Sequence, residues 1–137
     1  MEASGQSVKR GHAPVAFTER SVPVKIVLAG VLPALVGAVA GVLLGVSSIA
    51  YLAIGLLAAV GSFLSGLEHE NGWSGADRGF VAGAVYGTSL LLVHALVGTH
   101  ATVALGSFPP ALVLVTALVG MFLAAAGATG ATGADRA

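Results

Sequence analysis

The chain has 137 residues, of which 56% are hydrophobic and 9% are charged, whereas about a quarter of the residues in an ordinary soluble protein are charged. Six Lys and Arg residues balance six Asp and Glu residues, so neither net charge nor a basic cluster attracts nucleic acid, which we exclude as a partner. The chain contains no Cys, which excludes disulfides and thiolate chemistry. This composition indicates an integral membrane protein.

Two long segments, residues 26–67 and 79–134, contain no Asp, Glu, Lys or Arg. A helix needs about 20 apolar residues to cross the hydrocarbon core, so each segment is long enough for two spans. The spans are expected to be helical because open strands would leave backbone groups unsatisfied in lipid. The sequence therefore predicts an all-α membrane protein, a four-transmembrane-helix bundle within residues 23–128, with spans near 25–45, 48–67, 76–98 and 108–128 and flexible tails at 1–22 and 129–137.

The predicted breaks between spans carry turn and capping residues. Gly45 and the two following serines form the first turn, and the Pro-ended segment 98–110 forms the last connector, with Ser107 as the N-cap of the fourth helix. Between the second and third spans, an Asn-Gly turn precedes Ser74, which we expect to cap the third helix together with Asp77 in a capping box.

The basic residues are distributed asymmetrically about the predicted spans. Four spans place all six on one side, namely Lys9, Arg10, Arg20, Lys25, Arg78 and Arg136. The positive-inside rule then predicts a multi-pass protein of the cell membrane with both termini in the cytoplasm. An alternative interpretation takes the first span as a signal peptide cleaved after Ala38-Val39-Ala40, but the long polar leader and the continuing apolar run are atypical of one.

Glycines recur every fourth residue in the first and third predicted spans. The two stripes are Gly37, Gly41 and Gly45, and Gly79, Gly83 and Gly87. Small residues at this spacing let helix backbones approach closely in lipid. The repeat predicts two related helical hairpins whose stripes meet at the centre of the bundle, although Gly is common in membrane helices and packing alone explains it. Pro33, within the first span, is expected to kink its helix.

Polar groups inside a membrane commonly mark transport or catalysis, and this chain has few of them. No carboxylate lies in the interior of a predicted span, since Asp77 stands at the very start of the third, and this argues against proton- or cation-coupled antiport. His94 is the one titratable group well inside a span, and with Tyr86 and Ser89 it forms a candidate polar site. It could relay protons or bind a substrate, but the sequence favours a neutral, structural His bonded to a backbone carbonyl or a hydroxyl.

A second polar cluster lies in the predicted cytoplasmic loop 66–80. Its members are Glu68, His69, Glu70, Asp77 and Arg78. Carboxylates and imidazole suit several divalent ions, but neighbouring residues rarely converge on one metal without further ligands. Turn formation, helix capping and the positive-inside signal explain the segment without a metal, so we expect no metal and no cofactor.

The glycine-spaced first span, the hinge Gly72-Trp73 and the third span with Val85-Tyr86-Gly87 resemble small four-span membrane proteins of unknown function from bacteria and archaea. The resemblance covers residues 30–98. It implies a four-helix architecture and carries no activity or ligand. The acidic segment Glu68-His69-Glu70 departs from the more basic hinge associated with such proteins.

Two classes of function agree with the sequence. The first is a structural or interaction subunit that packs through its glycine stripes, in a homo-oligomer or a larger membrane complex within the lipid bilayer. The second is a small oligomeric channel or uncoupled transporter, with a pathway lined by Ser62, Ser65, Tyr86, Thr88, Ser89 and His94. We expect no enzymatic activity, because no pair of catalytic groups lies on one side within reach.

Overall fold

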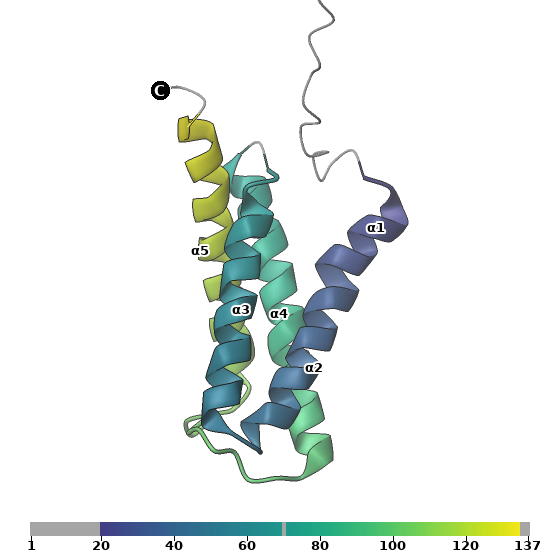
Figure 1. The fold of residues 1–137 in the computed structure, drawn as a ribbon, viewed down its shortest axis with the longest axis vertical. Helices are drawn as coiled ribbons and strands as arrows, with labels where there is room; N and C mark the ends of the chain where they lie inside the picture. Colours follow the sequence, from purple (N-terminus) through teal and green to yellow (C-terminus); the bar gives the residue numbers. More distant parts are fainter. Residues whose placement is uncertain (1–19, 70, 135–137) are drawn as a thin grey trace, which may run out of the picture.

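The computed structural model describes residues 20–69 and 71–134, and in them the chain forms an all-α four-helix bundle (Figure 1). In chain order the elements are α1 (Val22–Ile26), η2 (Val27–Val31), α2 (Leu32–Leu44), α3 (Ser48–Gly66), α4 (Gly72–Val97) and α5 (Ala111–Ala134). The first three elements run on without a break, so they form one rod. The predicted fold class is confirmed.

The outward faces of the four rods are apolar. Each rod is long and apolar enough to cross a membrane. Large side chains on these faces are mostly exposed, including Leu52 (62%), Leu56 (67%) and Phe122 (66%). Side chains of this kind are stable on a protein surface that contacts lipid rather than water. The chain is therefore a multi-pass membrane protein.

The first rod changes its hydrogen-bond pattern just before Pro33. Residues Val27–Val31 form a π-helix, in which the amide of Leu32 donates to the carbonyl of Val27, five residues earlier. A proline cannot donate a backbone hydrogen bond to the preceding turn, and a widened turn is one way in which a helix accommodates this. The α1 end of the rod diverges from α3, while its α2 end packs into the bundle (Figure 1).

The start of α4 differs from the sequence prediction. The helix begins at Gly72, not near residue 76, and its N-cap is Asn71, whose side-chain oxygen accepts from the Ser74 amide at 2.9 Å. The prediction that Ser74 is the N-cap is thus wrong. Asn71 is itself a strong capping residue, and its side-chain oxygen reaches the first turn of the helix. Asp77, expected to complete a capping box, is exposed one turn into the helix.

The capping assignment gives a testable difference. Asn71→Ala should lower the free energy of unfolding by about 1 kcal/mol, because the backbone amide of Ser74 loses the side-chain oxygen that accepts its hydrogen bond. Asp77→Ala should change it by less than about 0.5 kcal/mol. Denaturant titration of both variants in the same detergent measures the difference, and an equal loss in both would restore the predicted capping box.

The last helix is shifted toward the carboxyl terminus. It begins at Ala111 rather than near residue 108, directly after Pro109 and Pro110, and continues to Ala134. Ser107 is therefore too far from the first turn to be its N-cap. Residues 129–134 continue the helix, although the sequence suggested a flexible tail from residue 129 onward. The predicted tail residues 1–19 and 135–137 lie outside the described part of the chain.

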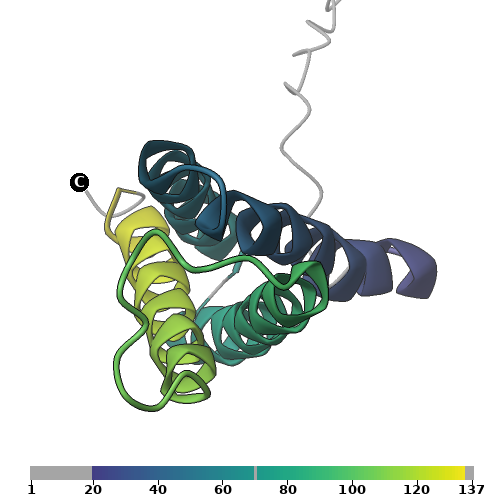
Figure 2. The ribbon, with the colours of Figure 1, turned by 90° about the horizontal axis from the view of Figure 1, so that it is seen from below.

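The helices alternate in direction, so the charged residues gather at one end of the bundle and the uncharged connecting segments lie at the other. The start of α1, the loop between α3 and α4 and the end of α5 lie at one end of the bundle, here called the charged end (Figure 1). The turn at residues 45–47 and the connector 98–110 lie at the opposite end, here called the connector end. Seen from there, the connector crosses the end of the bundle between α4 and α5 (Figure 2).

A cluster of fully buried apolar residues lies near the connector end. Ala40, Leu44 and Leu90 have no exposed surface and form one cluster between α2 and α4. The connector is held against this cluster, because the amide and the hydroxyl of Thr102 both donate to the Leu44 carbonyl at 2.8 Å. The bundle is therefore closed at this end, where the sequence places few ionisable groups.

Candidate functional site

The glycine stripe of α2 faces α4. A Cβ added to Gly37 would meet the carbonyl oxygen of Tyr86, and one added to Gly41 would meet that of Leu90. Because these neighbours are backbone atoms, a larger residue could be accommodated only if the two helices separated. At the end of the stripe, Gly45 lies instead against the side chain of Thr99 in the connector. This stripe is therefore used within the chain.

The glycine stripe of α4 faces α5, and not the stripe of α2. A Cβ on Gly79 would meet the carbonyl of Gly120, and one on Gly120 would meet the carbonyl of Gly79, so the approach is reciprocal. Gly83 and Gly87 both lie against Thr116. The expected meeting of the two stripes is wrong, because α4 turns one face to α2 and a different face to α5.

His94 joins α4 to α2. Its Nδ1 lies 3.3 Å from the carbonyl oxygen of Gly41, to which it donates when the ring is protonated at this nitrogen. The missing side chain of Gly41 leaves room for this approach, since the His94 amide lies only 3.1 Å from where a Cβ would stand. Of the three residues of the candidate polar site, Tyr86 lines a cavity together with residues of α2 and α3, whereas His94 and Ser89 are not among the residues that line it.

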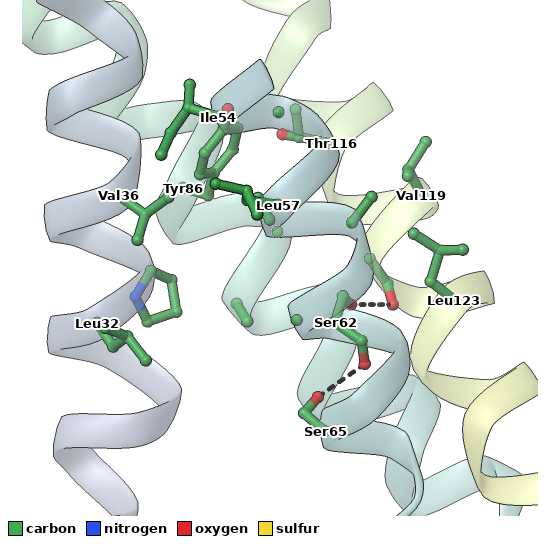
Figure 3. Close-up of a pocket in the computed structure, with 18 of the residues that line it drawn as sticks. Leu32, Val36, Ile54, Leu57, Ser62, Ser65, Tyr86, Thr116, Val119 and Leu123 are labelled. Carbon is green, nitrogen blue, oxygen red and sulfur yellow. Dashed lines mark hydrogen bonds between the residues drawn. The ribbon is translucent and has the colours of Figure 1, made fainter. Parts of the chain in front are cut away.

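A cavity of about 530 Å³ lies beneath α3, between that helix and α4. All four rods contribute to its wall (Figure 3). Most of the α3 residues that line it are small: Gly55, Ala58, Ala59, Gly61, Ser62 and Ser65, beside the larger Tyr51, Ile54 and Leu57. Glycine and alanine do not fill the space, which is why it remains open, and its volume is within the range of small-molecule and cofactor pockets, about 300–1,000 Å³.

The serine and threonine hydroxyls in the cavity wall are already hydrogen-bonded within the chain, and the wall also contains the tyrosines Tyr51 and Tyr86. Ser62 Oγ donates to the Gly120 carbonyl at 3.1 Å, Ser65 Oγ to the Ser62 carbonyl at 2.8 Å, and Thr116 Oγ1 to the Val113 carbonyl at 3.0 Å. A hydroxyl that donates to a helix carbonyl presents little polarity to a cavity. The rest of the wall consists almost entirely of apolar residues, so the cavity is suited to an apolar ligand.

The cavity opens toward the lipid-facing surface rather than along the bundle axis. Three apolar side chains that line it are also largely exposed: Leu32 on α2 (50%), Leu57 on α3 (66%) and Val119 on α5 (48%). They form a rim: Figure 3 shows Leu32 and Val119 on opposite sides of α3, to which Leu57 itself belongs. Helix α3 thus crosses over the cavity, whose exposed rim lies within the apolar span.

An ion cluster lies next to the cavity at the charged end. Glu68 accepts from Arg20 at 2.8 Å and pairs with Arg78 at 3.5 Å, and Arg78 also donates to the Ser65 carbonyl at 3.5 Å. The three side chains are 25%, 28% and 11% exposed for Arg20, Glu68 and Arg78, respectively. Because Ser65 also lines the cavity, the cluster and the cavity share a wall.

The predicted loop site is only partly assembled. Glu68 and Arg78 pair, while His69 is buried with its Nδ1 3.0 Å from the Ser65 carbonyl. Asp77 is exposed on α4, and Glu70 lies outside the described residues. Among residues 20–69 and 71–134, no three His, Asp or Glu side chains gather in a way that could hold a metal ion.

Sequence reasoning missed the ion pair of Arg20 and the cavity beneath α3. Arg20 was assigned to a flexible tail, although a basic residue just before a span is a frequent partner for an acidic loop. On α3, the spacing from Gly55 to Ser65 was visible, but the sequence does not indicate whether such a face is covered. Searches against family models, curated proteins and solved structures gave no match. The function is therefore argued from this geometry.

Proposed function

We propose that the protein is a structural or interaction subunit of the cell membrane, which binds another membrane component through its apolar surfaces and has no enzymatic role. One observation carries the proposal: four polar side chains within the spans, those of Ser62, Ser65, His94 and Thr116, are bonded to backbone carbonyls of the same chain. His94 and Ser62, in particular, connect neighbouring helices. Groups used in this way hold the bundle together and are poorly placed to solvate a passing ion.

The alternative function, a small oligomeric channel or uncoupled transporter, has one observation in its favour. Three of the residues expected to line a pathway, Ser62, Ser65 and Tyr86, border the same cavity. The other three, Thr88, Ser89 and His94, are not among its lining residues. The cavity also opens sideways into the apolar span, so its geometry favours association with a membrane component over conduction.

The proposal places the charged end in the cytoplasm, together with both termini. Arg20, Lys25 and Arg78 belong to this end, whereas the connector 98–110 contains no Lys or Arg. This distribution is the one that the positive-inside rule associates with a cytoplasmic face. A partner protein or a second copy of the chain would contact the outward faces, since both glycine stripes lie against the chain's own backbone and connector.

Flux measurements on liposomes distinguish the two functions. We expect vesicles containing the wild-type protein to show the same flux of ions and small polar solutes as empty vesicles, because the cavity offers no polar path. His94→Ala should leave this flux unchanged and should lower the free energy of unfolding by only about 0.6 kcal/mol, a typical value for a hydrogen bond between membrane helices. A flux above that of empty vesicles, altered by His94→Ala, would overturn the proposal in favour of transport.

A further inference from the structure

The cavity beneath α3 is an apolar site with access from the bilayer. Its rim residues Leu32 and Leu57 are exposed within the span, and its floor is formed by α4 and α5. A Cβ added to Gly55 or Gly61, both of which line it, would meet no atom within 4 Å. In a bilayer, such a space is filled by whatever apolar group can enter from the side.

The contacts that hold α3 against α5 limit the width of any apolar group that can enter the cavity. Ser62 Oγ bonds to Gly120 of α5, and Gly66 lies against the backbone of Ala124. A transmembrane helix has a diameter of about 10–12 Å and could not pass beneath α3 without breaking these contacts. A hydrocarbon chain is flexible and much narrower, so the geometry favours a lipid tail over a helix from another protein.

The polar wall at the charged end suits a negatively charged headgroup. The carbonyl of Ser65, a cavity residue, accepts from Arg78, which together with Arg20 brackets the single carboxylate of Glu68. Lys25, on the first rod before the rim residue Leu32, adds a third basic residue at the charged end. Basic pockets between transmembrane helices bind anionic lipid headgroups in this way.

We propose that the cavity beneath α3 binds one acyl chain of an anionic phospholipid, whose phosphate lies at Arg20 and Arg78. The guanidinium groups supply several N–H donors in a fixed plane, which match phosphate oxygens. This inference rests on the proposed function and specifies it: the bound membrane component is a lipid of the leaflet at the charged end.

Native mass spectrometry of the full chain in detergent tests the acyl-chain site. Titration with phosphatidylglycerol should give one retained lipid per chain. Ala58→Phe, which projects a ring into the cavity, should lower retention about ten-fold relative to Ala53→Phe, which places the same ring on the exposed side of the same helix. Unchanged melting temperatures would show that both variants are folded.

A second variant tests the headgroup site independently. The wild type should retain phosphatidylglycerol about five-fold better than phosphatidylcholine, because one cation near a membrane surface contributes about 1 kcal/mol to the binding of an anionic lipid. Arg20→Gln should abolish this preference, although the variant should still retain phosphatidylcholine. Equal retention by Ala58→Phe and Ala53→Phe would overturn the acyl-chain site, and no preference in the wild type would overturn the headgroup site. If a lipid-binding test fails and the liposomes show no flux above that of empty vesicles, only the lipid site is overturned and the interaction function stands. Flux above that of empty vesicles would contradict the interaction function itself.

Discussion

Gly79→Leu is expected to separate α4 from α5 and to lower the free energy of unfolding by about 3 kcal/mol or more, as an overpacked core does. A Cβ at this position would meet the Gly120 carbonyl and would stand 2.7 Å from the Ala124 Cβ. The first neighbour is backbone, which cannot rotate away, so the helices themselves must move. Titration with a denaturing detergent, followed by circular dichroism, measures the loss.

Gly55→Leu is the matched control, since it makes the same change in a neighbouring helix. Its Cβ meets nothing within 4 Å, and replacing Gly by Leu in a helix is favourable by about 0.8 kcal/mol in itself. We expect no loss of stability in this variant. If the two variants were equally stable, the close contact between α4 and α5 would be contradicted.

The second large effect is expected at the ion cluster. Arg78→Ala should lower the free energy of unfolding by about 2–4 kcal/mol. The partly buried carboxylate of Glu68 would lose one of its two ion-pair partners and would keep only Arg20. Apart from the Arg78 ion pair, the Glu68 Oε2 atom has no hydrogen bond and is shielded from solvent. The neighbouring carboxylate of Asp77 is exposed, so Asp77→Ala should change stability little.

A double-mutant cycle isolates the pairing energy. Glu68→Gln should cost less stability in the Arg78→Ala background than in the wild type, because the ion pair between Glu68 and Arg78 is already broken there. The same denaturant titration measures all four proteins. Additive losses from the two substitutions would show that Glu68 and Arg78 do not interact, and would contradict the cluster described at the charged end.

The architecture was predictable because membrane insertion leaves a strong signal in a sequence. Between Lys25 and Glu68, and again beyond Arg78, no charged residue interrupts the apolar segments, and their lengths each allow two spans. The boundaries were less predictable. Asn71 competes with Ser74 for the same cap, and both prolines before Ala111 delay the last helix, so the outcome depends on local geometry.

The partners of the glycine stripes could not be read from their spacing. Four-residue spacing defines a face of a helix, but it does not specify which neighbour that face contacts. The stripes of α2 and α4 therefore looked like partners, whereas Gly41 lies against Leu90 and Gly79 against Gly120. The cavity was unpredictable for the same reason, since a space beneath α3 depends on how far that helix stands from α4.

Spin-label accessibility at Ala58 tests most directly whether the space beneath α3 is apolar and open to lipid. The chain contains no Cys, so Ala58→Cys gives a single labelling site in the cavity, with Ala53→Cys on the exposed face and Ala40→Cys in the core as references. In vesicles, we predict that the label at 58 collides with oxygen almost as often as the label at 53, and seldom with a water-soluble nickel chelate. Frequent collision with the chelate would indicate a water-filled pathway, and protection from both, as at 40, would indicate that no cavity exists; either result would contradict the account.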